Sequence, residues 1–229
     1  MNLGEIEALA RTYLDDEAGQ ELWSAAFLRG LGNEAQNEAN LRARYLVESA
    51  NPRVCQITLV AGQAEYSLHP AIIVARRFEF VPAQTGWQPI TLRRTTFDAL
   101  DHEDPHWTGF TGRPTAVVLD LQRGRFRLDR TPTVDTLGTI KLTAWRRPLD
   151  SELLEEPGDE PVIPADQHPE LVHWILHKAY MRKDAETFDR DLSDRHLQTF
   201  EAYFGPRPTA AQIRAMATDH DGEIHSYFY

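Results

Sequence analysis

The hydrophobic and polar positions of this chain repeat with a helical period at its two ends and with a strand period in between. Near the start, apolar residues recur at spacings of three and four, which predicts a helix with one buried face. Asn2 precedes this stretch and suits the N-cap position, and the acidic run from Asp15 is expected to end the helix. The predicted buried face consists of Leu3, Ile6, Leu9, Ala10 and Tyr13.

A longer helix is expected to begin after Ser24, a good N-cap residue, and to continue until Asn51-Pro52 stops it. Gly30 and Gly32 lie inside it, and each glycine costs a helix about 1 kcal/mol relative to alanine. The apolar stripe resumes after them, so we expect a kink or a close helix contact at this point. The stripe consists of Phe27, Leu28, Leu31, Ala35, Ala39 and Leu46.

Between Val54 and Arg146 the apolar residues mostly alternate with polar ones, which is typical of half-buried strands. Six or seven short strands separated by turns predict a sandwich or a small barrel. Within this region, Thr96 is expected to cap a single helical turn over Phe97–Leu100.

A hairpin is expected around the turn at Gly124. Phe126 and Leu128 would face inward and Arg125, Arg127 and Asp129 outward, as in a half-exposed hairpin at a sheet edge. Arginines interleaved with an aromatic residue are also found in nucleic-acid-binding strands, but the edge hairpin is the simpler interpretation.

Two further helices are predicted between Val162 and Phe204. The first starts near Pro169 and the second ends at Gly205. The apolar face of the first helix consists of Leu171, Val172, Ile175, Leu176, Ala179 and Tyr180, and that of the second of Leu192, His196, Leu197, Phe200, Tyr203 and Phe204. The opposite face of the first helix carries His173, Trp174, His177 and Met181. This face suits a metal site, a subunit contact or a second packing layer.

These elements predict an α+β fold, because the strands are grouped together and do not alternate with helices. Residues 1–53 and 162–205 are expected to form a helical bundle, with residues 54–149 inserted as an antiparallel β-sandwich or small barrel. Residues 150–161 carry six acids and no base, and we interpret them as a solvated acidic linker. Residues 206–229 would form a C-terminal arm, with a short helix capped by Thr209.

Composition limits the classes of function. The 229 residues carry a net charge of −11, which argues against a dedicated nucleic-acid-binding protein. The sequence has no run of 18 apolar residues and an acidic start, so neither a membrane span nor a secretory signal is expected. The single cysteine, Cys55, cannot form an internal disulfide and points to a reducing cytoplasm or to indifference to redox conditions.

A metal site is the sharpest enzymatic candidate. His173 and His177 are four residues apart on one helix, so both imidazoles could reach one ion, with Asp166 or His168 nearby. The glutamate that serves as the general base in zinc-protease helices is absent between them. A metal-dependent hydrolase therefore stays an alternative function.

Other chemical candidates are weaker. The loop residues His102, Glu103, Asp104 and His106 are of metal-ligand type but lack a fixed spacing, and Cys55 has no histidine beside it. Glycine-rich nucleotide-binding motifs and a GxSxG motif are absent. No cofactor is expected.

Several motifs occur in order along nearly the whole chain. They are Tyr13-Leu14-Asp15-Asp16, Leu22-Trp23-Ser24, Leu31 to Ala39, Ile57 to Tyr66, Gly112-Arg113-Pro114, Ile163-Pro164 with His168, Ala179-Tyr180 and Phe200 to Pro208. In these motifs the chain resembles the head-to-tail adaptor (connector, or head-completion) proteins of tailed bacteriophages, especially those related to the tubular tail adaptor of short-tailed phages.

The resemblance implies a structural virion protein and no enzyme. Such adaptors form a ring, typically of twelve subunits, between the portal protein and the tail nozzle or tail tube protein. DNA passes through the ring without sequence-specific binding. The resemblance therefore implies a place in the neck of the virion after assembly in the host cytoplasm, with the helical part making the ring. Another ring-forming scaffold module is the remaining alternative.

The resemblance also suggests which residues contact partners. The arm from Arg207 to Tyr229 would dock on the portal, through Arg207, Ile224, Tyr227, Phe228 and Tyr229. The inner face of the first C-terminal helix is expected to pack within its own subunit. Its opposite face would offer Trp174, His177 and Met181 to a neighbouring subunit.

Overall fold

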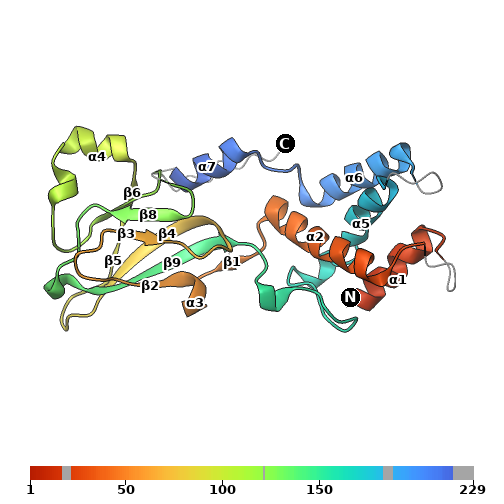
Figure 1. Ribbon diagram of the computed structural model, residues 1–229, viewed down its shortest axis with the longest axis horizontal. Coiled ribbons are helices and arrows are strands. Elements are labelled where there is room, and N and C mark those ends of the chain that lie inside the picture. Colours follow the sequence, from red (N-terminus) through yellow and green to blue (C-terminus); the bar gives the residue numbers. More distant parts are fainter. Residues whose placement is uncertain (17–21, 121, 183–187, 219–229) are drawn as a thin grey trace. The chain divides into compact units, whose positions relative to one another are not determined.

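The computed structural model describes residues 1–16, 22–120, 122–182 and 188–218, which fall into two compact units (Figure 1). One unit comprises Met1–Leu46 and Arg147–Pro208 and is helical. The other comprises Val47–Arg146 and the segment that begins at Thr209, and it is mainly β. The α+β class predicted from the sequence is confirmed.

The unit boundaries differ from the expected ones. The sequence suggested that the helical bundle runs to residue 53, but the chain passes into the β unit at Val47. Val47 and Glu48 pair with Trp145 and Ala144 in an antiparallel sheet. This pairing joins residues 47–53 to the β unit, because backbone hydrogen bonds to a long central strand outweigh local helix propensity.

Among its described residues, the helical unit contains four helices, α1 (Leu3–Tyr13), α2 (Ala25–Ala43), α5 (Leu171–Tyr180) and α6 (Arg190–Phe204), and two 3₁₀ turns, η3 (Asp150–Glu152) and η4 (Ala165–Gln167). The predicted caps are confirmed. Asn2 and Glu5 form a capping box at the start of α1, and the Ser24 hydroxyl accepts a hydrogen bond from the Phe27 N–H. α6 ends at Gly205, whose φ of 82° is accessible to glycine without strain.

Helix α2 ends at Ala43, well before the predicted stop at Asn51-Pro52, because Arg44 adopts a left-handed conformation with φ of 61°. Of the two glycines inside α2, Gly32 is at a close helix contact and Gly30 is not. A Cβ atom on Gly32 would lie 3.4 Å from Leu3 Cδ1, whereas the position of a Cβ on Gly30 is open. The prediction of a close contact is therefore confirmed at Gly32.

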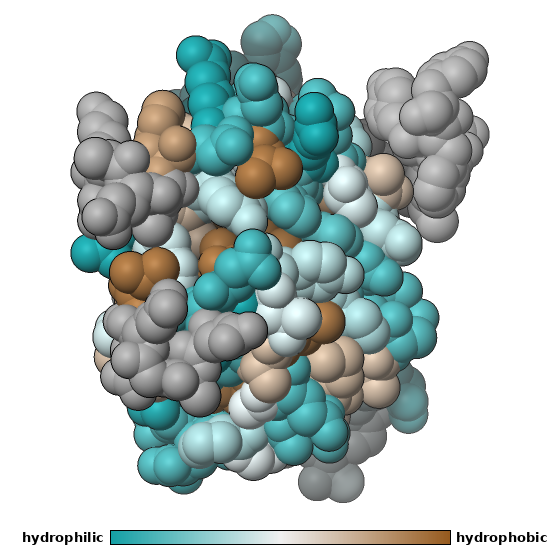
Figure 2. All heavy atoms as spheres, turned by 90° about the vertical axis from the view of Figure 1, so that its right-hand side faces the viewer, coloured by the Kyte–Doolittle hydropathy of each residue, from teal (hydrophilic) through white to brown (hydrophobic). Residues whose placement is uncertain are grey.

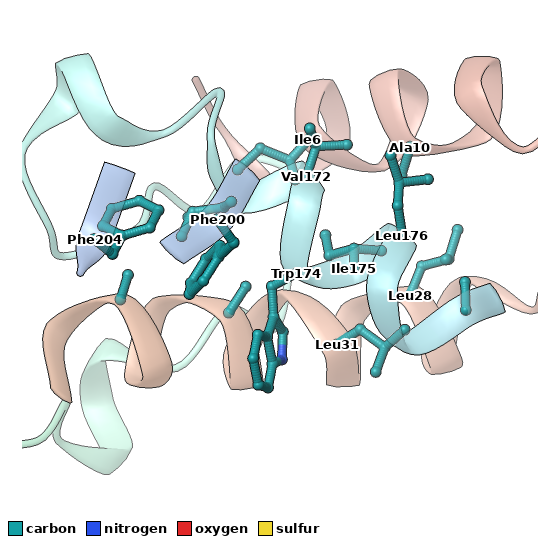
Figure 3. Close-up of a cluster of buried hydrophobic side chains, with 14 of the residues drawn as sticks. Ile6, Ala10, Leu28, Leu31, Val172, Trp174, Ile175, Leu176, Phe200 and Phe204 are labelled. Carbon is teal, nitrogen blue, oxygen red and sulfur yellow. The ribbon is translucent and has the colours of Figure 1, made fainter. Parts of the chain in front are cut away.

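One hydrophobic core holds the helical unit together, and α5 lies in the middle of it (Figure 3). α5 contacts α1, α2 and α6. Ile6 and Ala10 reach it from α1, Leu28 and Leu31 from α2, and Phe200 and Phe204 from α6, as labelled in Figure 3.

The acidic segment 150–161 is not a solvated linker, and that expectation is wrong. Leu154 is only 1% exposed, and Asn33 on α2 both donates to and accepts from its backbone, at 2.9 and 2.8 Å. The carbonyls of Pro157 and Asp159 accept from the N–H groups of Gly4 and Leu3, which α1 itself leaves unpaired. A count of charges does not reveal this role, because the backbone and one leucine make the contacts with α1 and α2, while Glu155, Glu156 and Glu160 are exposed.

The strands in the described part of the β unit form two sheets. The first has the order β1 (Val47–Glu48), β9 (Gly138–Arg146), β4 (Ile72–Pro82) and β5 (Ile90–Thr91), with β2 (Gln56–Thr58) also paired to β9. The second has the order β3 (Glu65–Ser67), β8 (Arg125–Leu128), β7 (Ala116–Val118) and β6 (Arg93–Thr95). The two sheets share a core, where the buried rings of Phe78 and Phe126 lie 5.3 Å apart.

Three details of the predicted β architecture need correction. β6 and β7 run parallel, so the unit is not purely antiparallel. The predicted hairpin of β7 and β8 is present, with Gly124 at φ of 77°, but β8 is also paired with β3 and is therefore not an edge strand. The alternation of inward Phe126 and Leu128 cannot distinguish an edge strand from an inner one. Asp129 does not face outward as expected, because its carboxylate is buried and accepts from the N–H groups of Thr115 and Ala116.

Three short helices and two 3₁₀ turns complete the described part of the fold. α3 (Pro52–Cys55), η1 (Trp107–Gly109) and η2 (Val134–Thr136) lie between strands. α4 (Phe97–Glu103) is capped by Thr96 as predicted, although it is longer than one turn. α7 (Ala210–Thr218) begins after Thr209, whose hydroxyl accepts from the Gln212 N–H, and it contacts β4.

Candidate interaction sites

Helix α5 was expected to have one inner and one outer face, and the inner face is as predicted. Leu171, Ile175 and Ala179 are fully buried in the helical unit. Because α1, α2 and α6 all contact this ten-residue helix, its buried surface extends well beyond one stripe.

Trp174 lies in the core of its own unit, so its expected outward position is wrong. Its side chain is 8% exposed, and its ring lies 5.3 Å from that of Phe200 (Figure 3). The Arg42 guanidinium lies 5.6 Å and the Lys178 ammonium 5.4 Å from the centre of the indole. α2 and α6 flank α5 and cover this position, which helical periodicity alone does not reveal.

His177 connects α5 to α6 through Ser193. The Ser193 hydroxyl donates to the His177 carbonyl at 2.9 Å, and His177 Nδ1 lies 3.1 Å from the Ser193 carbonyl oxygen. A carbonyl oxygen only accepts, so Nδ1 carries the proton. Burial lowers the pKa of His177, which keeps the ring neutral at neutral pH.

Met181 is 44% exposed at the end of α5. Figure 2 shows one face of the molecule, on which hydrophilic residues predominate and hydrophobic residues form small separate areas. A contact of His177 and Met181 with a neighbouring subunit stays a prediction.

The sequence did not reveal that His173 lies against His196 on α6. Their Nδ1 atoms are 3.0 Å apart, so one ring donates and the other accepts, and the accepting ring is neutral. Two tyrosines extend this pair into a stack of rings. The ring centres of Tyr203 and His173 lie 6.5 Å apart, and those of Tyr180 and His196 lie 5.9 Å apart. We call Tyr203, His173, His196 and Tyr180 the histidine–tyrosine stack.

Both histidines of the stack resist protonation. Burial is the main cause of the lowered pKa of His173, and Glu170 opposes it in part. Burial also lowers the pKa of His196, with further contributions from His173 and His177. A charged imidazole in this stack would lose solvation and face a second histidine.

The structure does not bring the predicted metal ligands together. His173 contacts His196 whereas His177 contacts Ser193, and His168 is bonded through Nε2 to the Ile163 carbonyl oxygen at 2.9 Å. Within residues 1–16, 22–120, 122–182 and 188–218, no group of three or more His, Cys, Asp or Glu residues is arranged to hold a metal ion.

The other chemical candidates also have separate partners. Glu103 forms a two-pronged ion pair with Arg93 at 2.7 and 2.9 Å, and the His102 ring contacts the Asp98 carbonyl oxygen. Cys55 is buried, and burial raises the pKa of its thiol to about 11, so it is a poor nucleophile at neutral pH.

Arg207, predicted to contact the portal, forms an ion pair inside the helical unit. Its Nε lies 3.4 Å from the Glu38 carboxylate, which is 6% exposed and also accepts from Arg42 at 3.1 Å. Arg42 further donates to Glu201 and to the carbonyl oxygen of Gly205. The i, i+4 spacing of Glu38 and Arg42 was the one sequence signal for this network. Of the other predicted portal contacts, Ile224, Tyr227, Phe228 and Tyr229 lie outside the described residues.

A family model described as SU10 adaptor protein matches residues 1–221. The chain belongs to this family.

Members of this family are bacteriophage adaptors, so the protein is a structural virion component that interacts with phage head and tail components. The adaptor resemblance is confirmed at this level, and the closer relation to the tubular tail adaptor of short-tailed phages stays a prediction. No curated protein matches the chain. Among the helices in the described part of the chain, none is both long and apolar enough to cross a membrane.

Proposed function

We propose that the protein forms a ring between the portal and the tail, joins head to tail and continues the channel for DNA. Its partners are the portal protein, the tail nozzle or tail tube protein, and further copies of itself, with twelve copies as the expected number. The family match over residues 1–221 carries this proposal, because it covers both compact units and the start of the C-terminal segment.

The core of the helical unit supports assembly from a subunit that is already folded. Trp174, Phe200 and the neighbouring apolar residues are buried without any partner chain. A subunit with a complete core can fold first and join a ring afterwards.

The net charge of −11 supports a conduit through which DNA passes without sequence-specific binding. Phosphate groups are repelled by an acidic protein, so the ring would not hold DNA in transit. The protein would act without a cofactor and without enzymatic activity. His173 and His177, the metal ligands of the alternative hydrolase hypothesis, instead stabilise the packing of α5 against α6.

The arm from Arg207 to Tyr229 is the proposed portal contact, and His177 and Met181 are proposed to face the neighbouring subunit. In the virion the protein would lie in the neck, after assembly in the host cytoplasm.

The test uses purified protein, portal rings from the same phage and a phage mutant that lacks this gene. We expect negative-stain images of portal rings with an added ring, and DNA-filled heads without tails from the mutant. Purified protein should restore tail attachment to these heads in vitro. Failure to bind the portal, together with normal virions from the mutant, would contradict the proposal.

A further inference from the structure

The β unit has an exposed surface that combines arginines with apolar residues. It is centred on a shallow depression of about 480 Å³, lined by Gly62–Glu65, Arg125, Arg127 and Thr131. We call this depression and its apolar rim the β3 surface, because Glu65 at the start of β3 lines it together with the residues just before it.

The rim of the β3 surface is apolar. Three loops meet here, since Gly62 N–H donates to the Pro132 carbonyl and Thr131 N–H to the Phe110 carbonyl, both at 2.9 Å. Each loop exposes one large hydrophobic side chain: Val60, Phe110 and Val134. Exposed apolar residues grouped in this way mark a protein-binding surface.

The two arginines of the β3 surface differ in the contacts that their side chains make. Arg127 is held by Glu65 at 3.2 Å, by the Thr108 carbonyl and by the ring of Trp107. Arg125 is exposed, and its side chain forms no hydrogen bond or ion pair with any residue that the structure describes. Arg125 is therefore available to a carboxylate of a partner.

The charge of the chain is divided unequally between its units. Residues 1–46 and 147–208 contain 22 acidic and 11 basic residues, a net charge of −11, whereas residues 47–146 and 209–229 contain 13 acidic and 13 basic ones, a net charge of zero. The acidic partner that suits the β3 surface is thus present in the helical unit of another copy.

Within the helical unit, segment 150–160 matches the β3 surface in chemistry. Glu155, Glu156 and Glu160 are exposed and form no ion pair with the described residues, and Leu153 is an exposed apolar side chain among them. This segment lines a depression of about 460 Å³. Carboxylates around a leucine are complementary to arginines beside an apolar rim.

We propose that the β3 surface binds segment 150–160 of a second copy of this chain. The two surfaces are different and lie in different units, so the contact is heterologous, as closure of a ring requires. This inference rests on the proposed ring. A DNA strand is less suitable, because Glu65 and the apolar rim would oppose a phosphate backbone.

The test measures ring assembly on portal rings for three variants. Arg125→Glu alone and Glu155→Arg with Glu156→Arg should each lower assembly about tenfold or more, because like charges then meet. Combining all three changes in one chain should restore assembly to within about threefold of the wild type. Arg53→Glu, a change at another exposed arginine of the β unit without an ion pair to the described residues, is the matched control and should have no effect.

A second measurement detects the contact directly. Rings assembled from a mixture of Arg125→Cys chains and Glu156→Cys chains should form disulfide-linked dimers on oxidation. Cys55 contributes little background because it is buried.

The outcomes separate this inference from the proposed function. If wild-type protein forms no ring on the portal, both are overturned. If rings form but the charge reversals have no effect, or no crosslink appears, only the contact proposed here is wrong. If Arg125→Glu leaves assembly intact and changes the retention of DNA in filled heads, the β3 surface faces DNA and the inference is likewise overturned.

Discussion

His173 on α5 and His196 on α6 share a hydrogen bond of 3.0 Å between their Nδ1 atoms. The bond needs at least one neutral ring, and it lies inside a stack that includes Tyr180 and Tyr203. It joins the two helices that carry much of the core of the helical unit, so its protonation state affects the stability of that unit.

Acid should destabilise the helical unit through these histidines. The folded-state pKa values of His173, His177 and His196 are lowered, so the unfolded chain binds more protons. The contribution of these histidines to the free energy of unfolding is then fully present above the unfolded pKa of about 6.5, and it decreases as the pH falls below that value. Urea denaturation at pH 7.5 and pH 5.5 measures this difference.

His196→Gln should reduce this dependence on pH, and His102→Gln, at an exposed position on α4, serves as the control. Equal pH dependence of the wild type and His196→Gln would show that the stack does not couple protonation to folding.

Trp174→Ala should destabilise the isolated subunit, because it removes a buried indole between α2 and α6. Large-to-small changes of this kind cost about 3–5 kcal/mol. The free energy of unfolding from urea denaturation gives the value, and Trp87→Ala, at a more exposed tryptophan, should cost far less. A change below 1 kcal/mol for Trp174→Ala would mean that the ring serves a contact between subunits.

Two glycines of α2 should respond in opposite ways to the same substitution. A side chain on Gly30 meets open space, so Gly30→Leu should raise stability by about 0.5–1 kcal/mol through helix propensity. Gly32→Leu should cost about 1–3 kcal/mol, because Leu3 and Leu154 already occupy the space. Thermal unfolding of both variants measures the contrast, and a similar shift for both would rule out close packing at Gly32.

Substitutions in the network around Glu38 should differ in their effect on the free energy of unfolding. Arg207 is 65% exposed, so Arg207→Ala should cost less than about 1 kcal/mol in unfolding. Glu38→Ala removes the buried partner of Arg42 and should cost about 3 kcal/mol.

If the C-terminal arm docks on the portal, Arg207→Ala should also weaken binding to portal rings in a sedimentation assay. Unchanged binding would remove Arg207 from the portal contact.

Met181→Asp tests the proposed contact between subunits. The side chain is exposed, so the free energy of unfolding should change by no more than about 0.5 kcal/mol. Assembly of rings on the portal should decrease strongly, since a charge would be placed in the interface. Gln198→Asp adds the same charge at an exposed position of α6 and should assemble normally. Equal assembly of the two variants would place Met181 outside the interface.

The sequence by itself determined the type of the longer helices and of the main strands. The spacing of Leu171, Ile175 and Ala179 identified the inner face of α5, and Asn2, Ser24 and Gly205 marked helix ends. These features depend on residues a few positions apart, and such local spacing is visible in the chain.

Only the tertiary structure decided which elements lie beside one another. Trp174 is buried because α2 and α6 flank α5, and His173 has His196 as its partner although His177 is closer in sequence. Leu154 is buried and its backbone is bonded to Asn33 on α2, although acids surround it in sequence. Each of these contacts joins residues that are far apart in the chain, and a periodic pattern contains no information about such distances.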